Sequence, residues 1–558
     1  MKNEPNSGKI HLRPLCDFIN PAITEQAGII EIRNGENNDP VIRGLEYDSR
    51  KTEKGFIFFA LSGLHMDGHD FIPDAINRGA LAIVHEKELA VYRDNIIYIK
   101  AKNSRFAMSP IANAFYDHPS RHMGIIGVTG TEGKSTTVYL IYQLLKLMNK
   151  KTGFISTVMR GDGSSEIRNT EHQTTPEAVT IHRLLAEMNL NGAEYAVLET
   201  SSHGLSKKTN RLGDVDFDVG VMTNVTHEHL EFHGSWEQYR SDKAKLFRSL
   251  DESPSSHLKD NPEGNLSGQE DFPVPSFGVV NGDDPSADYF SAATRHKTYT
   301  YSTRGAEADL SVILMESGTL NNWYEVLVSA TGQTVTIRDQ LPGAFNAGNV
   351  LASLLTVSNL LSVGIEELVP LVPYLKPVRG RMNAVNCGQP FEVLVDYAHT
   401  PSSFETIFPP LRERLNLRGG RLIALFGSAG ERDTRKRPLQ GEIAARYSDI
   451  VILADEDPRG EEPMAILEEI AKGCEASSGC EAASGSVAGT RMIRNETLFL
   501  IPDRPLAIRK AFSLAKAGDL VLLLGKGHEN SIIYADKAIT FDEISEAEAG
   551  LKESGYLI

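Results

Sequence analysis

The stretch Gly127-Val128-Thr129-Gly130-Thr131-Glu132-Gly133-Lys134-Ser135-Thr136-Thr137 decides the fold of the middle of this chain. An apolar run at residues 123–128 is typical of a buried strand, and residues 138–145 carry the apolar spacing of a helix. A glycine-rich turn between them lets backbone N–H groups at the helix N-terminus approach phosphate oxygens. The pattern therefore predicts a phosphate-binding loop.

The side chains of this loop suit a nucleoside triphosphate. Lys134 would reach the β- and γ-phosphates, and the Ser135 hydroxyl would hold Mg²⁺. The strict pattern has glycine five residues before Gly133, where this chain has Val128, so the loop is a variant. A glycine-rich turn without a ligand is the alternative, and it explains the Gly-Lys-Ser-Thr run less well. The predicted ATP-binding positions in the loop are Thr129, Gly130, Thr131, Glu132, Gly133, Lys134, Ser135 and Thr136.

Length and composition predict a large soluble protein. A chain of 558 residues suggests about three domains. Its net charge of −17 argues against broad binding to nucleic acid or anionic membranes. The four cysteines form no Cys-x-x-Cys pair, which favours a reducing compartment and no zinc site. No apolar stretch resembles a secretory signal or a membrane span, so we expect a cytoplasmic protein.

Two polar side chains follow strands of the predicted central sheet. Residues 196–199 form a strand that ends in Glu199, and the strand at 219–224 is followed by His229. Ligands of parallel sheets gather at the carboxyl ends of strands, on the edge that carries the phosphate loop. Taken singly, each residue is better explained as a polar side chain that faces solvent. Beside a Mg²⁺-nucleotide loop, each becomes a candidate metal ligand.

The remaining chain predicts two further α/β units. Residues 1–118 mix strands and helices, and 119–376 form the central unit. In 377–558, strands at 391–396, 422–427, 450–454 and 520–524 each end in a polar loop, which indicates a doubly wound domain. Residues 251–273 and 474–489 read as polar or flexible insertions. The fold class predicted is α/β, with a small N-terminal domain, a central phosphate-loop ATPase-type parallel sheet and a C-terminal Rossmann-like domain.

Together these stretches resemble the Mur ligases, the ATP-dependent amide-forming enzymes of peptidoglycan precursor synthesis. The similarity spans nearly the whole chain and is greatest to the members that add the third residue of the stem peptide. It implies a N-terminal domain that binds the UDP-sugar, a central ATP-binding domain and a C-terminal domain that binds an amino acid. It also implies small-molecule substrates, ATP with Mg²⁺, and a monomeric enzyme.

The resemblance assigns roles to individual positions. It places a carbamylated lysine at Lys243, which would join Ser135, Glu199 and His229 as a metal ligand, and it counts Asp396 and Lys134 among the catalytic residues. Its UDP-sugar-peptide set is Tyr47, Ser49, Leu64, His65, Met66, Gln173, Thr174, Thr175, Ser201 and Arg211. Further nucleotide contacts would be Asn346, Asn349, Arg379 and His399. Its amino-acid set is Arg432, Glu456, Asp457, Pro458, Arg459, Gly525 and Glu529.

Several positions depart from the family pattern. Glu132 replaces an asparagine in the phosphate loop and adds a negative charge near the triphosphate. Glu228 replaces an aspartate and Asn383 a glutamate, and the chemistry stays plausible with these three changes. The diaminopimelate signature Asp-Asn-Pro-Arg appears as Glu456-Asp457-Pro458-Arg459, which leaves the amino acid open. Arg459 favours meso-diaminopimelate, whose distal carboxylate it could hold. Carboxylates paired with Arg459 would instead favour lysine or ornithine.

Three other functions remain as alternatives. A folylpolyglutamate synthase-like ligase shares the phosphate loop, but the N-terminal segment with Asp48-Ser49-Arg50 argues against it. A nucleotide-binding switch or motor would hydrolyse ATP without an acceptor. A non-catalytic binding protein that keeps the fold has only Glu132 in its support.

Overall fold

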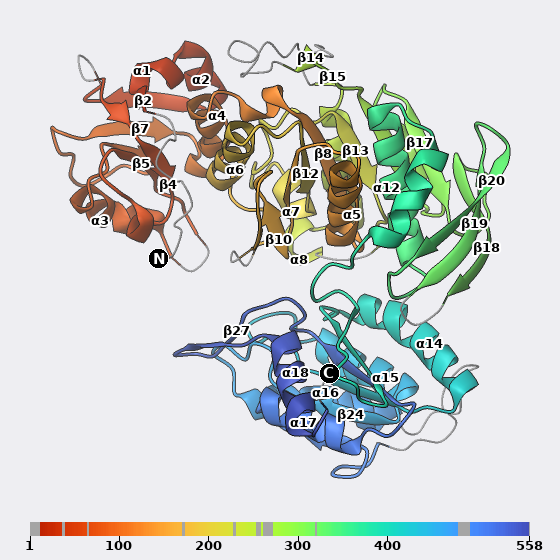
Figure 1. Ribbon diagram of the computed structural model, residues 1–558. Coiled ribbons are helices and arrows are strands. Elements are labelled where there is room, and N and C mark those ends of the chain that lie inside the picture. Colours follow the sequence, from red (N-terminus) through yellow and green to blue (C-terminus); the bar gives the residue numbers. More distant parts are fainter. Residues whose placement is uncertain are drawn as a thin grey trace. The chain divides into compact units, whose positions relative to one another are not determined.

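The computed structural model describes residues 12–35, 39–63, 66–169, 173–226, 230–252, 258–259, 272–317, 321–477 and 492–556 (Figure 1). Leu64, His65 and His229, three of the predicted site residues, lie outside these ranges. The chain divides into two compact units. The first holds Met1–Met315, Tyr324–Ile337 and Ala347–Pro373; the second holds Glu316–Trp323, Arg338–Asn346 and Tyr374–Ile558. The predicted domain boundaries at 118/119 and 376/377 stay predictions.

The N-terminal part of the first unit is a five-stranded sheet of order β2-β7-β6-β5-β4. β4 to β7 run parallel, and β2 pairs antiparallel with β7. Ile57 and Phe59 face one core and Phe58 the other, as the alternation of a strand requires. The strands are β2 (Ile29–Arg33), β4 (Gly44–Glu46), β5 (Phe56–Phe59), β6 (Ala82–His85) and β7 (Ile97–Ala101), with β1 (Arg13–Pro14) and β3 (Val41–Ile42) as a separate pair.

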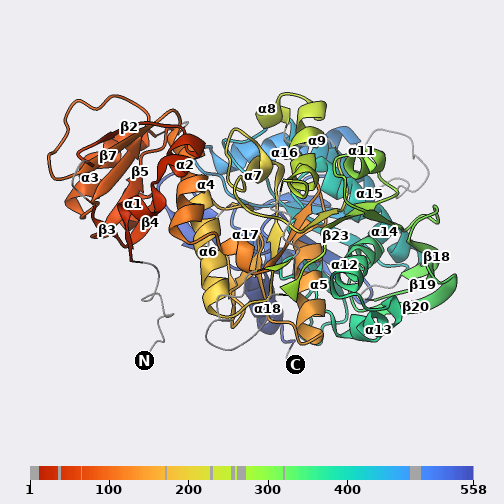
Figure 2. The same ribbon diagram turned by 90° about the horizontal axis from the view of Figure 1, so that it is seen from above.

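Helices cover both faces of this sheet. The longest, α4 (Ser104–Phe115), lies beside α6 (Ala178–Leu190) of the central part, and both contribute to one apolar core (Figure 2). The core thus joins the N-terminal sheet to the central region. The other elements here are α1 (Leu15–Phe18), α2 (Pro21–Gln26), η1 (Ser49–Lys51), η2 (Gly68–Phe71), α3 (Ile72–Asn77) and η3 (Pro119–His122).

The central sheet has eleven strands in the order β11-β10-β9-β12-β8-β13-β16-β17-β18-β19-β20. β8 lies between β12 and β13, all three are parallel, and all six residues of β8 are buried. This burial explains its uninterrupted apolar sequence. The strands are β8 (Gly124–Thr129), β9 (Thr152–Ile155), β10 (Met159–Gly161), β11 (Glu166–Arg168), β12 (Tyr195–Glu199), β13 (Val219–Met222), β16 (Phe277–Asn281), β17 (Thr298–Ser302), β18 (Leu310–Ser317), β19 (Asn322–Val328) and β20 (Gln333–Asp339).

The helices of the central part begin near the carboxyl ends of these strands. α5 follows β8 directly, and α9 buries Leu246 and Phe247 in the same core as Met222 of β13. Within the described residues, no single helix is long and apolar enough to cross a membrane. Asn346–Leu361 and Ile365–Tyr374, which are bent by 115° relative to each other, reach that length and apolarity only when taken together. The helices are α5 (Lys134–Leu147), α7 (Ser202–Leu205), α8 (Leu230–His233), α9 (Trp236–Ser249), α11 (Ala287–Ser291), α12 (Asn346–Leu361), α13 (Ile365–Leu368) and η4 (Val369–Tyr374).

The C-terminal sheet has six strands in the order β21-β22-β26-β23-β24-β25. All neighbours are parallel except the edge pair β21–β22, and separate apolar cores cover the two faces, so the predicted doubly wound arrangement is confirmed. The sequence had missed β21 and β25. The strands are β21 (Asn383–Ala384), β22 (Glu392–Asp396), β23 (Leu422–Phe426), β24 (Ile450–Leu453), β25 (Leu498–Leu500) and β26 (Leu520–Leu524).

The helices of this unit are α14 (Pro401–Arg418), α15 (Lys436–Tyr447), α16 (Pro463–Ser477), α17 (Arg504–Leu514) and α18 (Glu543–Glu553), with a small hairpin of β27 (Ser531–Ile533) and β28 (Ala538–Thr540). The structure describes only parts of the two predicted insertions. The boundary at 474 is wrong, because residues 474–477 belong to α16, where Ile466, Ile470 and Cys474 form one buried stripe, while 478–489 lie outside the described residues. Within 251–273, β14 (Leu258–Lys259) pairs with β15 (Phe272–Pro273), and 253–257 and 260–271 lie outside the described residues.

Candidate functional site

The phosphate loop lies between the end of β8 and the start of α5, where the sequence predicts it. Two of its glycines have backbone conformations that side chains disfavour: Gly130 has φ +153° and Gly133 has φ +81°. A Cβ at Gly130 would lie 1.9 Å from the Thr223 hydroxyl oxygen, and one at Gly133 would lie 2.5 Å from the Asn349 side-chain oxygen. Only glycine fits at either position.

The end of β13 fixes the path of the loop. The Glu132 N–H donates to Asn224 Oδ1 at 2.8 Å, and the Thr223 hydroxyl donates to the Glu132 carbonyl at 2.6 Å. The Thr131 N–H also donates to the Asn224 carbonyl at 2.8 Å. The backbone at Glu132 is therefore held by its neighbours whatever its side chain. This explains how the loop tolerates its departure from the family pattern.

Oxygen donors gather where the loop enters α5. The Ser135 hydroxyl donates to Glu199 Oε2 at 2.8 Å, and both residues are buried. The same oxygen accepts from the N–H and the hydroxyl of Thr157, at 2.8 and 2.9 Å. A carboxylate beside a hydroxyl is a donor set that suits Mg²⁺. The predicted ligands Ser135 and Glu199 thus lie together, and their chemistry fits the ion.

Sequence reasoning missed Thr157. It lies just beyond β9, which neighbours β12 in the sheet. The rule that pointed to Glu199, a polar residue at the carboxyl end of a parallel strand, applies to Thr157 equally.

Two lysines approach the loop from different elements. The Lys134 ammonium donates to the Thr131 carbonyl at 2.7 Å. Lys243, on α9, is 2% exposed; its Nζ contacts the Gly130 carbonyl and lies 4.6 Å from the centre of the Tyr239 ring. The lysine identified by resemblance is therefore buried on α9, with its side chain against the phosphate loop. His229, the fourth predicted metal ligand, lies outside the described residues.

The other predicted nucleotide contacts are divided between the two units. Asn346 and Asn349 open α12, and Asn349 Oδ1 accepts from the Thr137 hydroxyl at 3.2 Å. Asp396 ends β22; its carboxylate accepts from the backbone N–H groups of Met382 and Ala398 at 2.8 and 2.7 Å, while burial raises its pKa. Arg379 pairs with Asp542 at 2.7 Å, and His399 Nδ1 lies 2.9 Å from the Tyr397 carbonyl oxygen.

Part of the predicted sugar-peptide set converges near β12. The Thr175 and Ser201 hydroxyls lie 2.9 Å apart, and Arg211 donates to the Thr175 carbonyl at 2.8 Å. Thr175 is 1% exposed, so its hydroxyl joins protein elements, while Thr174 is half-buried and Gln173 exposed. In the N-terminal sheet, Ser49 is buried, Tyr47 is half-buried and Met66 is 70% exposed.

The predicted amino-acid pocket contains a cation that sequence reasoning did not assign. Lys526 is fully buried, and its Nζ lies 2.8 Å from Asp457 Oδ1 and 2.5 Å from Glu529 Oε2. Asp457 and Glu529 therefore pair with Lys526, and neither forms an ion pair with Arg459 in the described part of the chain. The available signal was a lysine between two glycines, three residues before Glu529, at the end of β26.

Other charged groups of this predicted pocket have polar atoms that form no hydrogen bond with the described residues. Glu456 Oε2, Asp455 Oδ1 and the Nε–H of Arg459 are buried without a hydrogen-bond partner among the described residues. Burial raises the pKa of Asp455 to about 6, against the hydrogen bond from the Tyr534 hydroxyl at 2.9 Å. The backbone after Pro458 takes the left-handed conformation at Arg459, with φ +55°. Arg432 is exposed, and Gly525 lies against the Glu456 carboxylate.

The buried ammonium makes a testable contribution to stability. Lys526→Met should lower the free energy of unfolding by about 3–5 kcal/mol, because it leaves the buried Asp457 and the half-buried Glu529 as uncompensated charges. Urea unfolding followed by circular dichroism measures the loss. Lys537→Met, at an exposed position, is the matched control and should stay within about 0.5 kcal/mol of the original protein.

A second substitution checks the cause of that loss. Adding Asp457→Asn to Lys526→Met removes one of the two carboxylates left without a cation. This should recover part of the lost free energy of unfolding. Unfolding of Lys526→Met at the same urea concentration as the original protein would contradict the role given to Lys526.

Comparisons with known proteins agree with this architecture. Three family models match: the Mur ligase family catalytic domain at residues 41–119, the Mur ligase middle domain at 128–357 and the Mur ligase glutamate ligase domain at 380–527. The chain is 48% identical over 550 residues to the UDP-N-acetylmuramyl-tripeptide synthetase of Treponema denticola, covering 94% of this chain and 97% of that protein.

Two further relatives carry more specific names. The UDP-N-acetylmuramoyl-L-alanyl-D-glutamate–2,6-diaminopimelate ligase of Geobacillus kaustophilus is 36% identical, with 94% of this chain and 97% of that protein covered. A solved structure of a ligase with the same name is 27% identical, with a TM-score of 0.56 and coverage of 92% of this chain and 96% of that one.

The fold and the site define a phosphate-loop α/β enzyme built from three domains. The chain belongs to the Mur ligase family, and it is an ATP-dependent ligase. The predicted family and fold class are thereby confirmed, and neither a folate-type ligase nor a nucleotide switch is favoured.

Proposed function

We propose that the protein joins the amine of a diamino acid to the D-glutamate carboxylate of UDP-N-acetylmuramoyl-L-alanyl-D-glutamate, with ATP as co-substrate. The substrates are suggested by the names of its relatives, which are similar along almost their whole length. The observation that carries the proposal is the meeting of Lys134, Glu199 and Lys243 at one phosphate loop. These are the groups that phosphoryl transfer to a carboxylate requires.

The reaction has two steps. A carboxylate oxygen of the acceptor attacks the γ-phosphorus of ATP, and the bond from this phosphorus to the β,γ-bridging oxygen breaks. ADP departs, and the acceptor becomes an acyl phosphate. The neutral amine of the diamino acid then attacks the acyl carbon, loses a proton and expels inorganic phosphate. No protein nucleophile takes part, so the enzyme contributes positioning and charge neutralisation.

The residues of the loop have separate tasks in the first step. Lys134 and the loop N–H groups bind the β- and γ-phosphates. Ser135 and Glu199 would hold Mg²⁺, which supplies electrostatic stabilisation of the transferring phosphoryl group when bound. A carbamate on Lys243 would add oxygen ligands, whereas the unmodified ammonium would repel a cation. By family resemblance, Asp396, Arg379 and His399 would also contact the nucleotide.

The acceptor would be bound by residues of the first unit. Ser49, Tyr47 and Met66, with Leu64 and His65, would hold its UDP part. Gln173, Thr174 and Arg211 would contact the muramoyl-dipeptide. The hydrogen bonds between Thr175 and Ser201 hold the segment around Thr174 against the loop that follows β12.

We also propose that the protein acts as a cytoplasmic monomer; size-exclusion chromatography with light scattering tests the monomeric state.

The charges of the C-terminal pocket favour meso-diaminopimelate as the diamino acid. Because Lys526 already pairs with Asp457 and Glu529, Arg459 is left without a carboxylate partner in the described part of the chain. The half-buried guanidinium of Arg459 would gain from a carboxylate, and meso-diaminopimelate brings one at its distal end. Its distal ammonium would suit Glu456, whose Oε2 is also without a partner there. Lysine and ornithine would satisfy Glu456 alone.

Competition between substrates tests this choice. We expect the protein to prefer meso-diaminopimelate over lysine and ornithine when each is supplied with the UDP-linked dipeptide, ATP and Mg²⁺. Arg459→Ala should reduce kcat/KM for meso-diaminopimelate by about 10²-fold, as for the loss of a charged hydrogen-bonded pair, and should change that for lysine little. Phosphate release and mass spectrometry of the product measure both.

Arg494→Ala is the matched control, because Arg494 forms its ion pairs with Glu468 and Glu475 at the surface. It should leave the preference unchanged. If the original protein prefers lysine or ornithine, and Arg459→Ala keeps that preference, the assignment of Arg459 to a distal carboxylate is wrong.

A further inference from the structure

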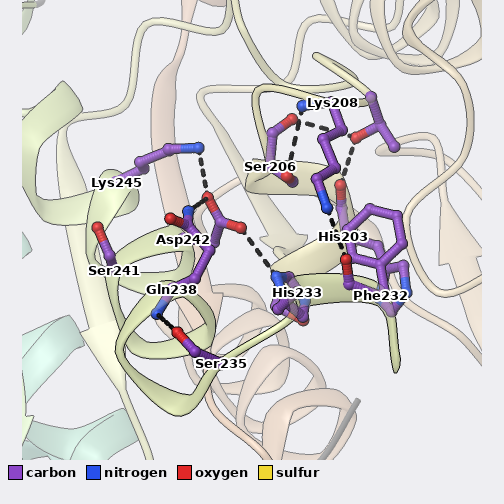
Figure 3. A network of polar contacts seen from close by, with 12 residues as sticks. His203, Ser206, Lys208, Phe232, His233, Ser235, Gln238, Ser241, Asp242 and Lys245 are labelled. Atoms are coloured by element: carbon purple, nitrogen blue, oxygen red, sulfur yellow. Dashed lines mark hydrogen bonds and ion pairs between the residues drawn. The ribbon is translucent and has the colours of Figure 1, made fainter. Parts of the chain in front are cut away.

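A buried polar chain connects α9 to the start of α7, and Figure 3 shows its contact between Asp242 and His233. His233, at the end of α8, has its Nδ1 2.8 Å from Asp242 Oδ2 and its Nε2 3.1 Å from the Ser202 hydroxyl. The side chains of His233 and Asp242 are 0% and 2% exposed, and Ser202 is also buried. The neighbouring helices α8 and α9 are thus joined to each other and to α7, about 30 residues earlier, by two hydrogen bonds away from solvent.

Asp242 is the charged centre of this chain. Burial raises its pKa, but hydrogen bonds from His233, Lys245 and Gln238 outweigh this and bring the pKa to about 2. The Lys245 ammonium lies 2.5 Å from Oδ1, and Gln238 Nε2 donates to the same oxygen at 3.1 Å. A carboxylate acceptor makes His233 Nδ1 the donor, and in a neutral imidazole Nε2 would then accept from the Ser202 hydroxyl.

The arrangement of serine, histidine and aspartate does not serve nucleophilic catalysis here. Ser202 is 2% exposed and is the first residue of α7, so no acyl substrate can reach its hydroxyl. The cluster therefore acts on protein elements.

Both ends of the cluster lie next to residues of the phosphate-loop site. Asp242 precedes Lys243, whose Nζ contacts the Gly130 carbonyl. Ser202 follows Ser201, which lies on the loop that begins after Glu199 and is hydrogen-bonded to Thr175. One turn earlier on α9, the Tyr239 hydroxyl lies 3.0 Å from the Thr131 hydroxyl. The rotation of α9 about its axis is thus fixed by Tyr239 at the phosphate loop and by Asp242 at His233.

We propose that His233 and Asp242 are positioning residues for Lys243. Their hydrogen bond holds α9 in the rotation that keeps Lys243 Nζ against the phosphate loop, and the bond to Ser202 keeps this helix in register with the segment after Glu199. The inference rests on the proposed function through the role of Lys243. Partners that orient a functional group of this kind typically change activity by about 10–100-fold when removed.

The first measurement concerns Lys243 itself and needs neither nucleotide nor metal. The rate at which an amine-acylating reagent labels Lys243, mapped by mass spectrometry in bicarbonate-free buffer, reports how firmly the side chain is held. Asp242→Ala and His233→Ala should label about tenfold faster than the original protein, because local opening becomes easier. Asp242→Asn keeps an oxygen acceptor for Nδ1–H and should label more slowly than Asp242→Ala.

The second measurement is acceptor-dependent ATP turnover. Asp242→Ala and His233→Ala should lower kcat by about 10–100-fold with a much smaller change in KM for ATP, because the loop and Lys134 are intact. Asp242→Asn should recover most of the loss. His182→Ala is the matched control: His182 is a fully buried histidine with its Nε2 3.4 Å from the Ser109 hydroxyl, on α6. It should lower thermal stability while leaving Lys243 labelling and kcat unchanged.

The outcomes separate this inference from the proposed function. If the original protein shows no acceptor-dependent turnover, the proposed function fails, while the labelling rates still judge the His233–Asp242 pair. If turnover is present but Asp242→Ala matches His182→Ala in both labelling rate and kcat, the pair is merely structural and the inference is overturned.

Discussion

Lys134→Ala should reduce ATP turnover in the presence of acceptor and amino acid by about 10³-fold or more. Its ammonium begins α5 and lies at the phosphate loop, where it donates to the Thr131 carbonyl at 2.7 Å. One charge on a transferring phosphoryl group contributes several kcal/mol to the transition state, at about 1.4 kcal/mol for each tenfold in rate. A coupled assay of phosphate release with the UDP-linked dipeptide measures the loss.

Lys146→Ala is the matched control on the same helix. Lys146 lies more than half exposed and pairs with Glu166 at 3.0 Å, so its removal should leave turnover within about twofold, as for most surface changes. The same assay tests the ligase activity itself, because turnover should require both acceptor and amino acid. Brisk hydrolysis of ATP in the absence of both would contradict the proposed reaction.

Lys243→Ala should cause the second large loss, about 10²–10³-fold in kcat, the range found when one stabilising group is removed from a transition state. The side chain is buried on the phosphate loop, in contact with the Gly130 carbonyl. If its active form is a carbamate, a short-chain carboxylic acid should restore part of the activity to Lys243→Ala by supplying the missing oxygen atoms. Activity measured against increasing acetate or propionate concentration tests this.

Lys243→Arg separates a carbamate from a plain cation at this position. Arginine keeps the positive charge but cannot form the carbamate, so Lys243→Arg should be about as inactive as Lys243→Ala. Substantial activity in Lys243→Arg, or an unmodified ammonium in a high-resolution map of the active enzyme, would show that the charge alone is needed.

Local sequence was sufficient where neighbouring residues set the structure. The phosphate loop was predictable because strand, glycines and helix follow one another within a few residues, and Gly130 and Gly133 have the positive φ angles that such a turn needs. Glu199 was predictable because a buried apolar strand ends directly at it. The position of Lys243 was found by family resemblance, since its helix is otherwise an ordinary amphipathic one.

Contacts between distant segments were not predictable in this way. The sequence had identified Asp457, Arg459 and Glu529 but could not say which charges pair, and Lys526 was overlooked. The pairing of Lys526 with Asp457 joins residues 69 positions apart, in the loops that follow β26 and β24, and these two strands flank β23 in the sheet. The missed edge strand β25 is short and becomes a strand by pairing with β24.

The sequence by itself determined the class of the fold, the phosphate loop and the strands that end in polar residues, because each depends on hydrophobic periodicity and turn residues within one short segment. Only the tertiary structure decided which buried charges neutralise one another and which polar groups hold α9 against the loop. The physical reason is that burial and hydrogen-bond partners depend on the packing of elements far apart along the chain. Among the described residues, Lys526 between two carboxylates is one place where that packing determines the chemistry, and His233 between Asp242 and Ser202 is another.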